Sequence, residues 1–92
     1  MTRTTLHARI TGRVQGVSFR AWTREQARAL DLAGWVRNRP DGSVEALISG
    51  PERAVADLRT RLHDGPPAAR VDKVETRTAA DTDAPHPFEV RT

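Results

Sequence analysis

Two glycines and two arginines stand close together near the N-terminus, in a segment whose residue types suit an anion. The segment reads Gly12-Arg13-Val14-Gln15-Gly16-Val17-Ser18-Phe19-Arg20. Gly12 and Gly16 can adopt positive φ, so successive backbone N–H groups can converge on one point with no Cβ in the way. Arg20 can place its guanidinium over the same point and bind two oxygens of one anion. The segment therefore predicts a site for a phosphoryl-like group.

This segment joins a predicted strand to a predicted helix. Before it, apolar residues alternate with polar ones, as in a strand with one buried face; the apolar ones are Leu6, Ala8 and Ile10. After it, residues recur at helical spacing, namely Phe19, Trp22, Gln26 and Leu30. The first N–H groups of a helix have no partner within the helix, and the helix dipole favours an anion beside them. The order of strand, loop and helix therefore also favours an anion site.

Taken alone, these nine residues leave a simpler interpretation open, namely a tight turn followed by a solvated surface arginine. Two common phosphate motifs are excluded. No Gly-Lys-Ser/Thr follows Gly16, so the loop is not a Walker A motif, and it lacks the third glycine of a dinucleotide-binding fingerprint.

A second segment makes the interpretation specific. It reads Gly34-Trp35-Val36-Arg37-Asn38-Arg39-Pro40-Asp41-Gly42-Ser43-Val44-Glu45, a strand, a short turn with Asp41-Gly42, and another strand. The two segments together, Gly-Arg-Val-Gln-Gly-Val-x-Phe-Arg and Gly-Trp-Val-Arg-Asn-x-x-Asp-Gly-x-Val-Glu, closely resemble the acylphosphatase family. The order and length of the remaining elements fit that family over nearly the whole chain.

The resemblance implies a role for each segment. In the family, the first loop binds the phosphoryl group through its backbone amides and its final arginine, and an asparagine on the second strand positions the attacking water. Carried onto this sequence, the catalytic residues are Arg20 and Asn38. The phosphate-binding residues are Gln15, Gly16, Val17, Ser18, Phe19 and Arg20.

The remaining elements predict an α+β protein. We expect one helix over residues 18–31 and a second from about 51 that ends at Gly65-Pro66-Pro67. Strands are expected over 33–38, 43–49 and from 70 or 71, with a short last strand at 88–90. The order βαββαβ is that of a ferredoxin-like sandwich, one antiparallel sheet with both helices on one face. Loop and hairpin would then meet at one edge of the sheet.

Several residues have predicted places in the helices. Ser18 is expected to cap the first helix, and Pro51 to occupy the first position of the second. The faces turned to the sheet are predicted as Phe19, Trp22, Ala27 and Leu30 in the first helix and Val55, Leu58 and Leu62 in the second.

Composition limits the classes of protein that remain. The chain has 92 residues, a size that suits one domain, and we expect a single acylphosphatase-like domain over residues 1–92. It has no cysteine, which excludes disulfides, thiolate nucleophiles and Cys-based metal sites. No apolar run approaches membrane-spanning length and no signal-peptide pattern is present, so we expect a cytoplasmic monomer. The net charge of +3 is weak evidence for a polyanionic partner.

The chemistry of an acyl phosphate agrees with the residues present. Its leaving group is a carboxylate, already a stable anion at neutral pH, so no general acid is needed. Arg20 and the amides of residues 15–19 can neutralise the phosphoryl oxygens, and Asn38 can position a water in line with phosphorus. We expect a small-molecule acyl phosphate as substrate, inorganic phosphate as product, no cofactor, no metal, and neither nucleic acid nor membrane as partner.

Other residues are weaker candidates. Ser18 as a nucleophile would need a base that no pattern places beside it. The three histidines, His7, His63 and His86, fall on separate elements without metal-ligand spacing. Arg13 and Arg37 flank the predicted site, and both substrate steering and simple solvation remain open for them.

Two other function classes are compatible with the fold. An RNA-binding module of this fold needs a strand motif of glycine and interleaved aromatics, and the chain has only two Trp and two Phe. An acylphosphatase-like domain can also be a regulatory or carbamoyl-phosphate-handling part of a larger maturation enzyme. Hydrolysis of a free acyl phosphate by the isolated chain would distinguish that role from an independent enzyme.

Overall fold

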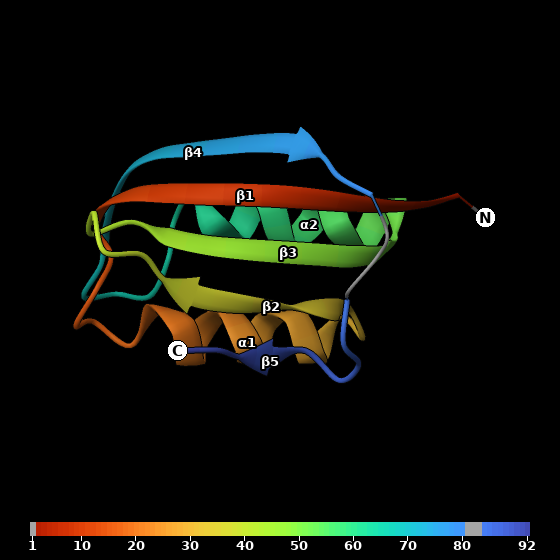
Figure 1. The fold of residues 1–92 in the computed structure, drawn as a ribbon, viewed down its shortest axis with the longest axis horizontal. Helices are drawn as coiled ribbons and strands as arrows, with labels where there is room; N and C mark the ends of the chain where they lie inside the picture. Colours follow the sequence, from red (N-terminus) through yellow and green to blue (C-terminus); the bar gives the residue numbers. More distant parts are fainter. Residues whose placement is uncertain (1, 81–83) are drawn as a thin grey trace.

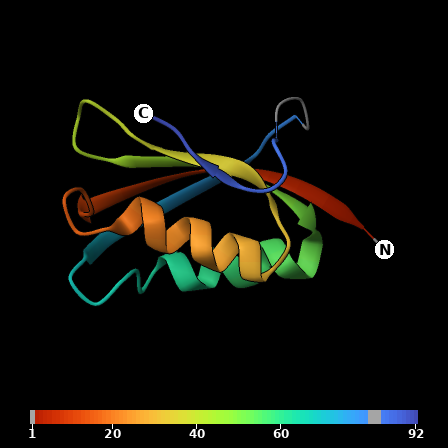
Figure 2. The same ribbon diagram turned by 90° about the horizontal axis from the view of Figure 1, so that it is seen from below.

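The computed structural model describes residues 2–80 and 84–92 and contains one sheet covered on one side by two helices (Figures 1 and 2). In chain order the elements are β1 (Arg3–Arg13), α1 (Phe19–Ala29), β2 (Ala33–Asn38), β3 (Val44–Pro51), α2 (Glu52–Leu62), β4 (Arg70–Thr78) and β5 (Glu89–Val90). The predicted ferredoxin-like α+β fold is confirmed. None of the helices within the described residues is long and apolar enough to cross a membrane.

The sheet order is β4-β1-β3-β2-β5, and one pairing differs from the prediction. β1 pairs antiparallel with β3 and β4, and β2 pairs antiparallel with β3. β5, however, runs parallel to β2, with Trp35 opposite Glu89 and Val36 opposite Val90. The prediction of a purely antiparallel sheet was therefore wrong at this edge. β3, α2 and β4 separate β2 from β5 in the chain, so no hairpin turn fixes the relative direction of these two strands.

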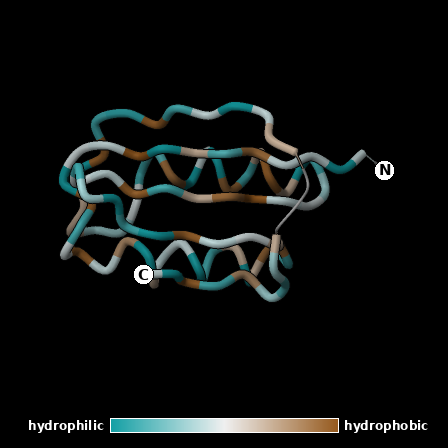
Figure 3. The backbone as a smooth tube through the Cα atoms, in the orientation of Figure 1, coloured by the Kyte–Doolittle hydropathy of each residue, from teal (hydrophilic) through white to brown (hydrophobic). Residues whose placement is uncertain are grey.

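The strands have one face in the core and one face open. Ala8 and Ile10 of β1 are fully buried against the helices, whereas His7 and Arg9 lie on the opposite face, as alternation along a strand requires. Figure 3 shows this alternation of apolar and polar residues along the strands. The core is completed by α2, whose stripe of Val55, Leu58 and Leu62 is buried as predicted.

Helix α1 differs from the prediction in its inner face. Phe19 and Ala27 are buried as expected, and the third buried residue is Thr23. Its hydroxyl donates to the carbonyl of Phe19 at 2.9 Å, which satisfies it within the helix. Trp22 and Leu30 are only partly buried at the margin of the core.

The second helix begins one residue later than predicted. Pro51 is the N-cap residue of α2 and the last residue of β3, with the extended backbone of φ −56° and ψ 137°. Glu52 is therefore the first helical residue, where its charge complements the helix dipole.

Candidate active site

The loop between β1 and α1 has two residues in the left-handed region. Gly16 has φ +74° and Ser18 has φ 62°. Such conformations turn successive N–H groups toward a common side, the geometry that binds anions. Within the described residues, no backbone N–H of residues 15–19 donates a hydrogen bond to the protein. The loop therefore presents a set of unused donors at the N-terminal end of a helix.

Ser18 occupies the predicted N-cap position, but its side chain makes no capping hydrogen bond. A capping serine has extended backbone angles that bring its hydroxyl back to the first helical N–H groups, whereas Ser18 is left-handed. The prediction that Ser18 caps the helix through its hydroxyl was therefore wrong. The left-handed backbone leaves the first N–H groups of α1 unpaired instead.

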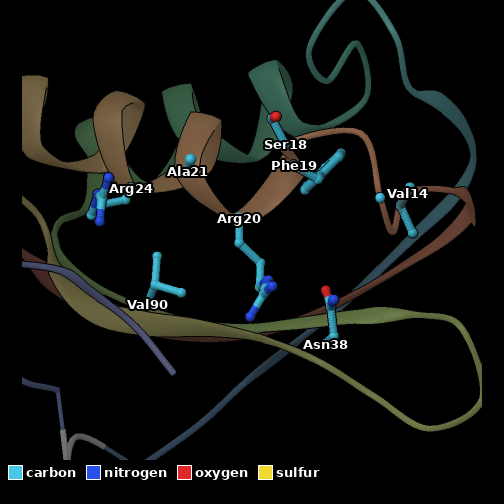
Figure 4. Close-up of a pocket in the computed structure, with 9 residues that line it drawn as sticks. Val14, Ser18, Phe19, Arg20, Ala21, Arg24, Asn38 and Val90 are labelled. Atoms are coloured by element: carbon cyan, nitrogen blue, oxygen red, sulfur yellow. The ribbon is translucent and has the colours of Figure 1, made fainter. Parts of the chain in front are cut away.

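Five of the seven predicted site residues line one pocket between α1 and the sheet. The pocket has a volume of about 260 Å³ and lies under the first turns of α1 (Figure 4). The predicted residues at its wall are Gly16, Ser18, Phe19, Arg20 and Asn38. Loop and hairpin thus meet at one edge of the sheet, as the order of elements predicted.

Arg20 projects from the first turn of α1 across the pocket toward β2 (Figure 4). Its Nη1 donates to the backbone carbonyl of Arg91 at 3.4 Å, a long hydrogen bond. No carboxylate pairs with Arg20 within the described residues, so most of its five N–H donors are available to a ligand.

Asn38 ends β2 on the side of the sheet that faces α1. Its Oδ1 is shielded from solvent and has no hydrogen-bond partner within the described residues. An unpaired buried acceptor costs about 1–3 kcal/mol, so such an atom needs an explanation. Asn38 lines the pocket, so a rotation of its amide about χ2 brings this acceptor to a donor that enters the pocket, such as water.

The other two predicted residues, Gln15 and Val17, do not line the pocket with their side chains. Gln15 Nε2 donates to the carbonyls of Arg39 and Ser43 at 2.8 and 2.9 Å, which fastens the loop to the β2–β3 turn. Val17 packs against the core. Any contact of these two residues with a phosphate would therefore come from their backbone N–H groups.

The β2–β3 turn is held by its own hydrogen bonds. Asp41 Oδ1 accepts from the hydroxyl of Ser43 at 2.6 Å and from its N–H at 2.9 Å, and Arg9 donates to Oδ2 at 2.6 Å. These bonds, those from Ser43 first, hold the pKa of Asp41 well below its usual range. The turn behind Asn38 is thus a fixed support for the pocket.

The weaker candidates lie away from the pocket. Arg37 is on the open face, where its Nε donates to Glu45 Oε1 at 2.6 Å, and Arg13 is exposed at the end of β1. His7, His63 and His86 bond to Glu45, the carbonyl of Arg59 and Asp31, three separate places. Residues 2–80 and 84–92 contain no group of three or more His, Cys, Asp or Glu that could hold a metal ion.

Comparison with known proteins identifies the family. A model of the family described as Acylphosphatase matches residues 6–90. The chain belongs to the acylphosphatase family. It is 62% identical to an acylphosphatase of Nitrobacter hamburgensis over 71 residues, which is 77% of this chain and 72% of that protein.

Solved acylphosphatase structures have the same fold. The structure of an acylphosphatase from Coxiella burnetii superposes with a TM-score of 0.91 at 37% identity, covering 97% of this chain and 93% of that one. The crystal structure of an acylphosphatase from Bacillus subtilis superposes with a TM-score of 0.91 at 33% identity, covering 99% of this chain and 100% of that one. Membership of the acylphosphatase family implies an acyl phosphate as substrate and phosphate as product.

Four residues of the acylphosphatase pocket were not predicted from the sequence: Val14, Ala21, Arg24 and Val90. Ala21 and Arg24 follow Arg20 by one and four positions, so helical spacing already places Arg24 on the same face as Arg20. Val90 comes from β5, whose pairing with β2 has no local signal in the sequence.

Proposed function

We propose that the protein hydrolyses the carboxyl–phosphate bond of acyl phosphates by direct attack of water on phosphorus, giving a carboxylate and inorganic phosphate. One observation carries the proposal. A loop with unpaired N–H groups, the guanidinium of Arg20 and the unpaired Oδ1 of Asn38 border the same small pocket.

In this proposal the phosphoryl group lies between the loop and Arg20. Backbone N–H groups of residues 15–19 donate to its oxygens, and the guanidinium of Arg20 neutralises the charge that they carry. The donors are already oriented before substrate arrives, because the left-handed residues and the Gln15 bonds to the β2–β3 turn fix the loop. Fixed donors favour the transition state because they need not reorganise as the reaction proceeds.

Asn38 positions the attacking water. With its amide turned to the pocket, Oδ1 accepts one hydrogen of the water, which orients a lone pair of the water oxygen toward phosphorus, opposite the leaving carboxylate. An amide cannot act as a base at neutral pH, so the second hydrogen of the water passes to a phosphoryl oxygen of the substrate. The P–O bond to the acyl group breaks, and its electron pair stays on the acyl oxygen, so the acyl group leaves as a carboxylate.

The leaving group explains why the site needs no general acid. A carboxylate is stable without a proton at neutral pH, whereas the alkoxide released from an alkyl phosphate is not. The proposed enzyme is therefore selective for acyl phosphates over alkyl phosphate monoesters. The charge at phosphorus is neutralised by Arg20 and by amides, so the mechanism is metal-independent.

All groups of this mechanism come from one chain, so we propose that a monomer is the working unit, with residues 1–92 acting as one acylphosphatase-like domain in the cytoplasm. Neither nucleic acid nor a membrane takes part.

The test is hydrolysis of acetyl phosphate in ¹⁸O-labelled water, with and without EDTA. We expect one labelled oxygen in the phosphate, none in the acetate, and the same rate after chelation. Label in the acetate would mean attack on the carbonyl carbon, and a rate lost to EDTA and restored by a divalent ion would contradict metal independence. No hydrolysis of acetyl phosphate by the folded chain would favour the regulatory role over the enzyme.

A Ser18→Gly variant separates direct attack by water from attack by a serine. Glycine takes the left-handed backbone of Ser18 without strain, so the loop shape is retained while the hydroxyl is lost. We expect hydrolysis to remain within about threefold of the parent rate, the change that a residue outside the chemistry produces. Complete loss of hydrolysis in this folded variant would make Ser18 the nucleophile.

A further inference from the structure

Arg24 is a second cation in the pocket that the proposed mechanism does not use. It follows Arg20 by one helical turn on α1, and its side chain lines the same pocket. Within residues 2–80 and 84–92 it makes no hydrogen bond, ion pair or ring contact. Its neighbour one turn further on, Arg28, is different, because Arg28 Nε donates to the carbonyl of Phe88 at 2.9 Å.

The pair Arg20 and Arg24 carries unneutralised charge. None of the described residues that line the pocket is an aspartate or glutamate. Like charges four positions apart on a helix repel each other, and partial burial of both side chains reduces the screening by water. In the proposed mechanism the phosphoryl group contacts Arg20 and the loop N–H groups, whereas Arg24 lies one helical turn further along α1 and is left without a direct contact. The guanidinium of Arg24 is therefore available to contact a second anionic group.

The two cations serve different parts of the pocket. Figure 4 shows Arg20 between Asn38 on one side and Arg24 and Val90 on the other. If the phosphorus lies near Asn38 and the loop, the acyl group of the substrate points toward Arg24. The wall on that side is made by Ala21 and Val90, which are small and apolar and suit a short carbon chain.

We propose that Arg24 binds a negatively charged group at the far end of the acyl chain, so that the preferred substrates are acyl phosphates carrying a second anion, a carboxylate or a phosphate ester. This inference rests on the proposed function. Arg24 is a specificity-determining residue in it: it binds substrate at a distance from phosphorus, and the chemistry at Arg20 and Asn38 is the same for every acyl phosphate.

The experiment compares three substrates of similar length in the parent and in Arg24→Gln. Succinyl phosphate carries a terminal carboxylate, 3-(phosphonooxy)propanoyl phosphate a terminal phosphate, and butyryl phosphate no second charge; the rate without enzyme is subtracted in each case. We expect kcat/KM of the parent for at least one of the charged substrates to exceed that for butyryl phosphate. In Arg24→Gln the ratio of kcat/KM for that charged substrate to kcat/KM for butyryl phosphate should fall by roughly three- to tenfold, the range for a partly exposed ion pair. Because Arg24→Gln also removes a charge close to Arg20, the readout is the ratio of kcat/KM for the charged substrate to that for butyryl phosphate, not either rate alone.

Arg59→Gln is the matched control. It removes the same charge from α2, where Arg59 is exposed and does not line the pocket. We expect it to leave the preference unchanged, which separates binding at Arg24 from a general effect of net charge. The charged substrate whose kcat/KM falls relative to butyryl phosphate in Arg24→Gln identifies the second anion as a carboxylate or a phosphate.

The outcomes separate this inference from the proposed function. Hydrolysis of all three substrates without a preference for charge, or an equal preference in the parent and Arg24→Gln, overturns the role of Arg24 and leaves the acylphosphatase mechanism intact. A folded parent that hydrolyses none of them overturns the proposed function and this inference with it. If Arg24→Gln and Arg59→Gln lower the preference equally, the effect is one of net charge and Arg24 is not a binding residue.

Discussion

Two adjacent residues of β2 lie in opposite chemical settings. Arg37 is on the open face, where its Nε donates one hydrogen bond to Glu45 Oε1 at 2.6 Å. Glu45 Oε2 pairs with His7 at 2.5 Å, so the charge of Arg37 is balanced within the protein. Asn38 is on the face toward α1, where its Oδ1 has no partner within the described residues and the cations Arg20 and Arg24 face no carboxylate. Strand alternation alone separates the two settings.

The difference shows which polar groups are available for function. Burial by itself raises the pKa of Glu45, but the hydrogen bonds from His7 and Arg37 outweigh this effect and hold the pKa below its usual value. The open face therefore uses its charges to stabilise the protein. The pocket leaves donors, cations and an acceptor unpaired, at a cost in stability that a bound substrate would offset.

The largest expected effect comes from conservative replacement of one arginine on each face. Arg20→Lys keeps the charge but loses the planar pair of donors, so kcat/KM for acetyl phosphate should fall roughly 10²- to 10³-fold, with weaker inhibition by phosphate. Arg37→Lys should change kcat/KM less than about threefold, because its guanidinium is occupied by Glu45. Steady-state kinetics of both folded variants checks this. A large loss in Arg37→Lys would show that the open face also serves the substrate.

The next effect concerns the acceptors of the two faces. In Asn38→Ala, kcat should fall about a hundredfold while the inhibition constant of phosphate changes less than about threefold, because the positioned water is lost and the phosphate cradle is not. Tm should not fall, since an unpaired buried acceptor has been removed. Glu45→Gln should show the reverse, a normal kcat and a lower Tm. A drop in Tm for Asn38→Ala as large as that for Glu45→Gln would make Asn38 a structural residue.

A smaller effect, on inhibition by phosphate, should distinguish two glycines that both have positive φ. Gly16 in the loop has φ +74°, Gly42 in the β2–β3 turn has φ +92°, and a Cβ at either would meet nothing within 4 Å. Alanine at each position should cost a similar strain, about 1–2 kcal/mol. Only Gly16→Ala should also weaken phosphate inhibition, by roughly tenfold, because relaxation of the loop turns an N–H away from the anion.

Thermal unfolding and phosphate inhibition measured on both variants decide the point. If Gly16→Ala is folded and phosphate inhibits it as it does the parent, then the loop N–H groups are not the anion site. Gly12→Ala cannot serve in this comparison, because the added Cβ would lie 2.2 Å from the carbonyl oxygen of Arg70 and the clash would destabilise the strand itself.

Much of the fold was predictable because its signals are local. Alternation and turn chemistry gave the bounds of β2 without error, and helical spacing identified the buried stripe of α2. The meeting of Gly16, Arg20 and Asn38 in one pocket follows from the order of elements. Local sequence patterns predict the strands and helices, and the order of those elements then positions the residues that they contain.

The features that could not be predicted depend on distant parts of the chain. The parallel pairing of β5 with β2 brings Val90 to the pocket. A strand of two residues is too short for a sequence pattern that would predict its partner or its direction. The left-handed backbone of Ser18 is unfavourable for serine alone and is imposed by the surrounding structure. The bonds from Gln15 to the carbonyls of Arg39 and Ser43 join segments that only the folded sheet brings together.

The smallest expected effect is a pH dependence that belongs to the open face alone. Because the folded pKa of Glu45 is lowered, its charged form stabilises the protein above the ordinary pKa of 4.5, and this contribution is lost as pH falls through the lower folded value. Glutamine does not titrate, so the Tm of Glu45→Gln should lie below the parent at pH 7 by about 4–8 °C, equivalent to about 1 kcal/mol. The difference should narrow as the pH is lowered from 5 to 3. Arg37→Lys keeps a cation beside Glu45 and should therefore retain the pH dependence of the parent's Tm. If the Tm difference between the parent and Glu45→Gln is independent of pH, Glu45 stabilises the protein by packing rather than by charge.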